Sequence, residues 1–203
     1  MQHVERHPLE PFLPTGARIL MLGSFPPKRE RWSMDFFYPN WINDMWRIMG
    51  FLFYADKHYF EIKEHKVFDH ECIAEFCSSK GLALYDTATE IRRLKDNASD
   101  KFLEIVTPTD IEALIAQLPN ATAIVTTGQK ATDIIVEKFC CIEPPIGSKT
   151  DIKIGNRREL YRSILFACSF HTNRTCRDYN IATFYINIHT TTSTNSYEIL
   201  CTN

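Results

Sequence analysis

Short apolar runs alternate along the chain with segments whose apolar residues recur at helical spacing. The runs lie at 19–22, 82–85 and 121–125. Because polar and apolar positions do not alternate within them, they predict strands that are covered on both faces. Their order with the helical segments predicts a parallel sheet with helices on both sides. Helices are expected at 41–53, 70–79, 107–118 and 128–139.

The predicted helices carry packing and capping signals. The helix over 41–53 has one broad apolar face, which we expect to pack in the core. Gly81 is a suitable C-terminal cap for the second helix. Thr107 or Thr109 is the expected N-cap of the third helix, and Pro108 fits its first turn. The apolar face of the first helix is formed by Trp41, Met45, Ile48, Met49 and Leu52.

Glycine follows two of the predicted strands, at Gly23 and at Gly128. Ligands of open α/β sheets bind beyond the carboxyl ends of the strands, so the loop GSFPP after the first strand is the expected site. The turn TTGQKA, with Lys130 in the first helical turn, could offer backbone amides to an anion, or it could be a plain tight turn. Neither phosphate-binding glycine motif is present, so we expect no nucleotide cofactor.

Composition describes an ordinary soluble domain. The 203 residues are 44% hydrophobic and 24% charged, with a net charge of −2, which suits one well-buried core. A polyanionic partner would have to be met by a local cluster, such as Lys28, Arg29 and Arg31. The start MQHVERHPLEP has no apolar signal segment and no run is long enough to span a membrane, so a cytoplasmic location is expected. The seven cysteines form no C-x-x-C pair, and we expect no metal site.

The segment GSFPPKRERWSMDFFYPNWINDMW resembles the uracil-DNA glycosylase superfamily. It is most similar to the branch that excises hypoxanthine and uracil, the DNA-deoxyinosine glycosylase-like enzymes. In that branch a strand ending in G-S-[FM]-P is followed by an aromatic pair, a proline-containing turn, an asparagine and an aromatic residue. GLALYDTATEIRR and AIVTTGQKA extend the resemblance over residues 15–140. The matching residues are Gly23, Ser24, Phe25, Pro26, Phe36, Phe37, Tyr38, Asn43 and Trp46.

The resemblance implies a monofunctional DNA glycosylase that hydrolyses the N-glycosidic bond of a deaminated base in base excision repair. It implies a three-layer α/β/α fold with a central four-stranded, mostly parallel sheet. The expected partner is DNA containing hypoxanthine or uracil, and the protein is expected to be a monomer that needs no cofactor and no membrane. This chemistry requires a flipped base on an aromatic face, with fixed donors that stabilise the departing anion.

Residue roles follow from the resemblance. Asn43 aligns with the catalytic asparagine, which positions the attacking water. The alternatives are that Asn43 caps a helix or that Asn40 is the aligned residue. Asp86 stands where relatives read the base edge, and its alternative is to cap a following helix. The predicted base-binding residues are Gly23, Ser24, Phe25, Pro26, Tyr38 and Asp86. Phe37 is a further candidate for stacking on the base. The alternative for Phe25 is a ring buried in the core. The predicted DNA-binding residues are Lys28, Arg29, Arg31 and Lys130.

The chain departs from the family pattern in two places. The uracil-excising relatives carry an aspartate or asparagine at or beside Phe25, and this chain has none there, as is typical of the proposed branch. Relatives also end in a Pro-Ser-x-Ser loop and a last helix, whereas residues 169–203 lack proline and glycine. We therefore divide the chain into a glycosylase-like domain, 1–168, and a divergent tail, 169–203, in which His171 lacks the expected His-Pro-Ser turn.

A shifted reading frame would explain the tail. If residues 164–168 are encoded as ATC-TTG-TTC-GCG-TGC after a C, the shifted frame reads Pro-Ser-Cys-Ser-Arg-Ala, which is close to the loop of relatives. The competing functions are an inactive or weakened glycosylase that lacks this DNA-clamping loop, and an α/β domain that binds a small molecule. Base excision from damaged oligonucleotides distinguishes these possibilities from an active enzyme.

Overall fold

The apolar runs of the sequence become neighbouring strands of one sheet. A computed structural model of the chain describes residues 3–95, 100–145, 148–154 and 160–165. The described part of the central sheet has five strands in the order β5-β2-β8-β10-β9. Every residue of β2 and β5 is buried, which explains their unbroken apolar sequences. The strands are β2 (Ile19–Gly23), β5 (Leu82–Asp86), β8 (Ala123–Thr126), β9 (Lys149–Lys153) and β10 (Leu160–Leu165).

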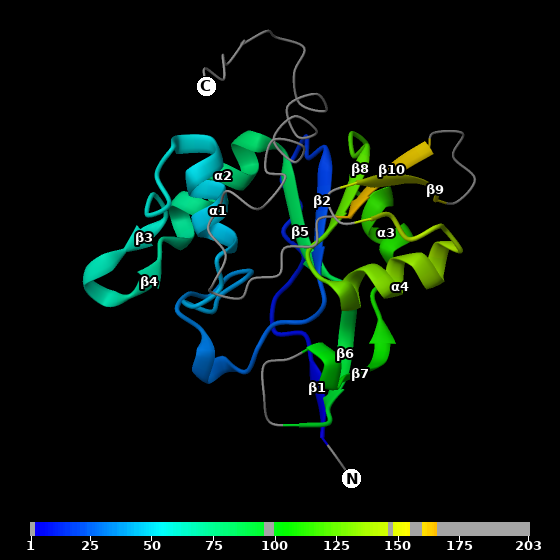
Figure 1. The fold of residues 1–203 in the computed structure, drawn as a ribbon, viewed down its shortest axis with the longest axis horizontal. Helices are drawn as coiled ribbons and strands as arrows, with labels where there is room; N and C mark the ends of the chain where they lie inside the picture. The colour runs from blue at the N-terminus through cyan, green and yellow to red at the C-terminus, as the bar shows by residue number, and fades with distance from the viewer. Residues whose placement is uncertain (1–2, 96–99, 146–147, 155–159, 166–203) are drawn as a thin grey trace, which may run out of the picture.

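The first four strands in this order run parallel, and β9 pairs antiparallel with β10. The prediction of four strands is therefore one too few, because β9 adds an antiparallel edge strand. The sequence of β9 contains polar residues such as Lys149 and Asp151, so it did not indicate a strand. Figure 1 shows α1 and α2 on one side of this sheet and α3 and α4 on the other. This arrangement follows from right-handed connections that leave β2 toward opposite edges of the sheet.

The helices begin and end close to their capping signals. Gly81 ends α2 in the left-handed conformation, with φ of 69°, as its position predicted. The predicted N-cap of α3 is wrong: the Asp110 carboxylate accepts the Ala113 N–H at 3.1 Å, because the preceding residues form a strand instead. The first helix begins at Met45, so Trp41 lies outside it. The helices are α1 (Met45–Tyr54), α2 (His70–Lys80), α3 (Ile111–Ala116) and α4 (Gln129–Phe139).

A second, antiparallel sheet continues from the carboxyl end of β5. It has the strand order β1-β6-β7 and was not predicted. In Figure 1 this sheet lies below the central one, next to the N-terminus. A short hairpin, β3-β4, joins α1 to α2. The remaining elements are β1 (Val4–Arg6), β3 (Glu61–Ile62), β4 (Val67–Phe68), β6 (Ala88–Arg93), β7 (Leu103–Pro108) and the single 3-10 turns η1 (Arg29–Arg31), η2 (Lys63–His65) and η3 (Asp100–Phe102).

The main core fills the space between the central sheet and its helices. Met45, Ile48 and Met49 of α1 are buried in it, as predicted, while Leu52 is half-buried at its edge. Trp41 packs against Phe68 of the short hairpin, with ring centroids 5.0 Å apart. Within the described parts of the chain, no helix has the length and apolar character needed to cross a membrane. The divergent tail, the reading-frame hypothesis and His171 lie outside the described residues.

Candidate active site

The carboxyl ends of three parallel strands lie side by side at the loop after β2, where the site was predicted. Gly23 of β2 stands opposite Asp86 of β5 in the strand register. The backbone N–H and the hydroxyl of Thr87 both donate to the Gly23 carbonyl, at 2.9 and 3.1 Å. On the other side of β2, the Thr127 N–H donates to the Leu22 carbonyl at 3.0 Å. The loops that leave these strands therefore start side by side.

Gly23 makes room for the carboxylate of Asp86. A Cβ atom at position 23 would lie 2.3 Å from Asp86 Oδ1, well inside van der Waals contact, and 3.6 Å from the Tyr38 hydroxyl. No residue with a side chain fits there while Asp86 keeps its place. The glycine that ends this buried strand is thus explained by what stands next to it, an acidic side chain.

Asp86 is buried and paired with a histidine from the N-terminal segment. His7 Nε2 lies 2.9 Å from Asp86 Oδ2, and the two side chains are only 2% and 8% exposed. His7 Nδ1 faces both the carbonyl of Leu9 at 2.8 Å and its N–H at 3.2 Å. Which ring nitrogen of His7 donates depends on its tautomer, and Nε2 shares its hydrogen bond with the Asp86 carboxyl group. The pair leaves Asp86 Oδ1 on the side of Gly23.

His7 carries no sequence signal of a functional residue, and the alternative in which Asp86 caps a helix is wrong. Asp86 does not cap a helix, because the residues after it form β6. Its backbone carbonyl instead accepts the buried hydroxyl of Thr109 at 2.7 Å. His7 is 79 residues away from Asp86 in the sequence, in a segment without a recognisable motif, so no local signal marks the pair.

Tyr38 reaches the same strand ends from the loop after η1. Its hydroxyl shares a hydrogen bond of 2.8 Å with the Thr127 hydroxyl. Burial, and then the negative charge of Asp86, raise the pKa of Tyr38, so this hydroxyl stays protonated. Tyr38 also has φ of 52°, in the left-handed region that residues with side chains rarely adopt. Such a backbone conformation is held only where the surroundings require it, and it is frequent at functional sites.

The loop 24–27 is fixed against the second sheet. Arg93 of β6 donates to the Pro26 carbonyl at 2.7 Å and to Glu5 Oε2 at 3.0 Å. Phe25 is 8% exposed and packs with Ala88, Ile91 and Leu103 in a small separate core. This placement fits the alternative in which Phe25 is a core ring, and its use as a stacking surface stays a prediction. Its ring also contacts His7 edge-on, with centroids 5.2 Å apart.

A second carboxylate, Asp100, faces this loop from the start of η3. The Ser24 side chain lowers the pKa of the Asp100 carboxyl group. A Cβ atom at Gly128, the glycine between β8 and α4, would lie 3.8 Å from Asp100 Oδ2. Burial is the main cause that raises the pKa of Asp100, and the charge of Asp86 raises it further. Sequence reasoning missed Asp100 because it stands in a polar segment between two strands that were not predicted.

Asn43 and Asn40 stand at the beginning of α1 with similar local contacts. Asn43 Oδ1 accepts the Met45 N–H at 2.9 Å, but the N-cap residue of α1 is Asp44, so the predicted alternative that Asn43 caps the helix is wrong. Asn40 Oδ1 accepts the Ile42 N–H at 3.1 Å. Arg47 Nη1 donates to the Asn43 carbonyl at 3.3 Å and thereby holds this turn. The catalytic role of Asn43 stays a prediction, because its helix contact explains the position equally well.

The predicted DNA-binding residues lie in two places. Arg29 and Arg31 are exposed on η1, directly after Lys28, which is half-buried. Arg29 pairs with Asp35, and its guanidinium lies 4.2 Å from the centroid of the Trp32 ring. Lys130 is half-buried in the first turn of α4, where its charge lowers the pKa of Asp100.

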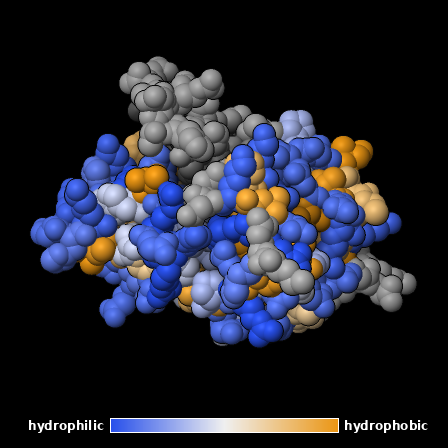
Figure 2. Space-filling view, turned by 90° about the horizontal axis from the view of Figure 1, so that it is seen from below, coloured by the Kyte–Doolittle hydropathy of each residue, from blue (hydrophilic) through white to orange (hydrophobic). Residues whose placement is uncertain are grey.

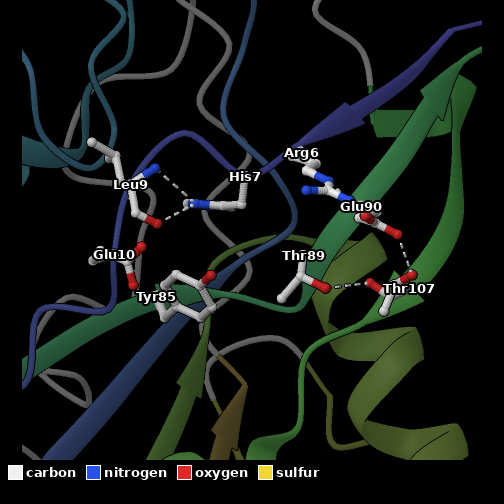
Figure 3. A pocket seen from close by; sticks show the side chains of 8 residues that line it. All are labelled: Arg6, His7, Leu9, Glu10, Tyr85, Thr89, Glu90 and Thr107. Carbon is white, nitrogen blue, oxygen red and sulfur yellow. Dashed lines mark hydrogen bonds and ion pairs between the residues drawn. The ribbon is translucent and has the colours of Figure 1, made fainter.

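An open pocket of about 310 Å³ lies next to His7, between the ends of β1, β5, β6 and β7. Figure 3 shows His7 and Tyr85 on one side of it and Thr89, Glu90 and Thr107 on the other. Figure 2, which views the molecule from below, shows a mostly hydrophilic face with small separate hydrophobic patches. Within the described residues, no three metal-ligating side chains gather into a possible metal site.

Among known proteins, similarity to this chain is found in solved structures. No protein-family model and no curated protein matches the chain. Among solved structures, it is similar to the solution NMR structure of a Methanosarcina acetivorans protein with a provisional assignment as a uracil DNA glycosylase. The two share 21% identity over 67% of this chain and 78% of the other, with a TM-score of 0.49. A likeness at this level assigns neither a fold family nor an activity.

Proposed function

We propose that this protein is a DNA glycosylase that hydrolyses the N-glycosidic bond of a deaminated base, hypoxanthine or uracil. One observation carries the proposal: the motif residues Gly23 and Asp86 stand opposite each other at adjoining strand ends, with Tyr38 beside them. These are the residues on which the resemblance to the uracil-DNA glycosylase superfamily rests. Their meeting at the carboxyl edge of a parallel sheet supports a common role in binding a ligand.

In this proposal Asp86 reads the edge of the flipped base. Oδ2 is occupied by His7, so Oδ1 is the atom that accepts a ring N–H of hypoxanthine or uracil. The backbone N–H groups of Ser24 and Phe25 supply donors to the base carbonyls. Fixed donors of this kind stabilise the anion that the base becomes as the bond breaks. Asn43 positions the attacking water.

The positive cluster of Lys28, Arg29 and Arg31 contacts the phosphates of the DNA. Phosphate contacts fix the register of the protein on DNA, whereas the base is recognised in the pocket. Each phosphate that the cluster neutralises adds about −0.9 to the slope of log affinity against log salt on duplex DNA. Replacing the three residues with glutamine is expected to flatten this slope. An unchanged slope would place the cluster away from the DNA.

Base excision tests the proposal directly. Labelled oligonucleotides that carry uracil, hypoxanthine or xanthine are incubated with the protein and then cleaved with alkali at abasic sites. We expect product from at least one of the first two substrates. Asn43→Ala is expected to lower the single-turnover rate by orders of magnitude with little effect on DNA binding, since a water-positioning group acts on the barrier.

Asn40→Ala checks the alignment, because Asn40 is the alternative aligned residue: a larger loss of rate in Asn40→Ala than in Asn43→Ala would assign the water-positioning role to Asn40. Each asparagine accepts one backbone N–H through Oδ1, so the two variants lose the same kind of structural contact. Equal, small effects of the two changes would leave Asn43 with a structural contact only. A protein that releases none of the bases, in a preparation shown to be folded, would overturn the proposed function. We keep the shifted reading frame as a hypothesis, which sequencing of the gene tests.

A further inference from the structure

The N-terminal segment brings a histidine to the candidate site, and the proposed function has so far given it no role. His7 follows β1 directly, and its backbone N–H donates to the Thr89 carbonyl at 2.8 Å, which continues the pairing of β1 with β6. Its side chain is buried against Asp86, the residue proposed to read the base edge. The position of this histidine is therefore set by a strand that lies far from the site motif in sequence.

Three aromatic rings surround the imidazole of His7. The Phe25 ring contacts it edge-on with centroids 5.2 Å apart, and the tilted ring of Tyr85 lies 4.7 Å away. Phe37 adds a third ring at 6.3 Å. At the polar edge of the imidazole, Nδ1 is 2.8 Å from the Leu9 carbonyl oxygen and 3.2 Å from the Leu9 nitrogen. Close packing and these backbone contacts hold the ring in one orientation, so the position of Nε2 is fixed.

His7 Nε2 in turn restricts the carboxyl group of Asp86. The contact of 2.9 Å goes to Oδ2. The last torsion of an aspartate side chain has a broad energy minimum, so an untethered carboxyl group turns easily about its bond to Cβ. Holding Oδ2 prevents this rotation and keeps Oδ1 on the side of Gly23. The same oxygen is engaged whichever ring nitrogen of His7 carries the proton.

We propose that His7 is a positioning residue: by holding Oδ2 of Asp86 it presents Oδ1 to the ring N–H of the flipped base. The inference rests on the proposed function, in which Oδ1 accepts that N–H. Hydrogen bonds weaken steeply when their geometry is lost, so a carboxylate that turns freely would recognise the base poorly. A carboxylate that is already in place loses no freedom when the base arrives.

The same N-terminal segment is also linked to the base-binding loop. Glu5 stands two residues before His7, so along a strand the two side chains lie on one face. Glu5 Oε2 accepts a hydrogen bond of 3.0 Å from Arg93 Nε, and Arg93 Nη2 donates to the Pro26 carbonyl at 2.7 Å. One face of this segment therefore connects to both the loop after β2 and Asp86, which supports its part in the geometry of the site.

Three substitutions of His7 test the proposal. His7→Phe keeps a ring for the aromatic contacts and removes Nε2. His7→Gln carries an amide group at about the reach of Nε2, whereas the shorter side chain of His7→Asn ends near the position of Nδ1. We expect His7→Phe and His7→Asn to lower the single-turnover rate at saturating enzyme by about 10- to 100-fold, since a misplacement of about 1 Å can cost about 100-fold. His7→Gln should keep the rate within about threefold of the wild type, because it can restore the contact with Asp86.

His58→Phe is the matched control. His58 Nδ1 lies 2.6 Å from Glu61 Oε2, so this variant also removes a contact between a histidine and a carboxyl group. The pair stands at the start of the β3-β4 hairpin, away from the carboxyl ends of the parallel strands (Figure 1). We expect His58→Phe to leave the excision rate unchanged. A loss of rate in His7→Phe alone then belongs to the site and not to the loss of such a contact in general.

DNA affinity separates positioning from general damage to the fold. Binding to undamaged duplex depends on phosphate contacts, so it should stay within about threefold of the wild type in all three His7 variants while the rate falls in two of them. A merely structural role would lower rate, affinity and melting temperature together, and His7→Gln would not rescue it. That pattern overturns the inference, as does an excision rate of His7→Phe or His7→Asn within about threefold of the wild type. If the folded wild type itself releases no base, the proposed function fails first, and the inference fails with it.

Discussion

Replacing Gly23 with alanine tests whether the end of β2 is built around the Asp86 carboxylate. The added Cβ atom would lie 2.3 Å from Asp86 Oδ1, about 1 Å inside the ordinary contact distance that begins at 3.4 Å. A flexible, exposed side chain could move away at little cost. Asp86 is buried and held by His7, so it can retreat only by weakening a bond of 2.9 Å.

The expected cost combines two effects. Inserting a methyl group into a filled region costs about 1 to 3 kcal/mol, and weakening a hydrogen bond to a carboxylate costs about 1.5 to 3 kcal/mol. Since the two effects share one movement of Asp86, we expect about 2 to 4 kcal/mol in total rather than their full sum. For a chain of this length, that corresponds to a fall in melting temperature of about 5 to 15 °C.

A double-mutant cycle, followed by denaturant or thermal unfolding, isolates the clash. In an Asp86→Ala background Oδ1 is absent, so Gly23→Ala should cost at least about 1.5 kcal/mol less than in the wild type. Gly16→Ala is the control: Gly16 has φ of 82° and nothing within 4 Å of its would-be Cβ. Its conformational cost of about 1 to 2 kcal/mol should not depend on Asp86. Equal costs of Gly23→Ala in both backgrounds would refute the reasoning.

Three further experiments test individual contacts and the burial of individual side chains. Tyr38→Phe removes a hydroxyl hydrogen bond of 2.8 Å and should cost about 1 kcal/mol in urea unfolding. Because burial raises the pKa of Tyr38, an ultraviolet titration should show at least one tyrosine fewer ionising near pH 10 in the folded wild type than in the unfolded chain. Glu61→Ala leaves the Arg47 guanidinium without its buried carboxylate, so we expect a loss of about 3 kcal/mol, and a loss below 1 kcal/mol would argue against this ion pair. Burial raises the pKa of the Cys77 thiol, so peptide mapping after brief alkylation at pH 8 should find the exposed Cys140 modified before Cys77.

The sequence by itself determined the elements that depend on neighbours in the chain. The apolar runs of β2 and β5 identified buried strands because a strand covered on both faces needs apolar side chains at every position. Gly81 identified a helix end because the left-handed conformation at that point favours a residue without a side chain. The glycine at the end of β2 marked the edge of the sheet at which the candidate site lies.

Other local patterns were compatible with more than one structure. Ala88 and Ile91, the buried residues of β6, are spaced three apart, as on a helix. Their segment became a strand because β1, which is far from it in sequence, and β7, the next strand, pair with its two edges. With β7 formed, the start of α3 moved to Asp110. These elements depend on the strands that pair with them, and the sequence of a single segment does not show which strands those are.

The location of the site could be predicted from the sequence, whereas its chemistry depends mostly on the tertiary structure. Asp86 could be singled out from its place after a strand, but its partner His7 comes from the other end of the domain. Asp100, which lies between β6 and β7, has its pKa shifted by Ser24 and Asp86, residues that are distant from it in the sequence. Burial and nearby charges raise the pKa values of Tyr38 and Asp100, and both causes are properties of the packed chain. Residues that are distant in sequence acquire them only when the strands have paired.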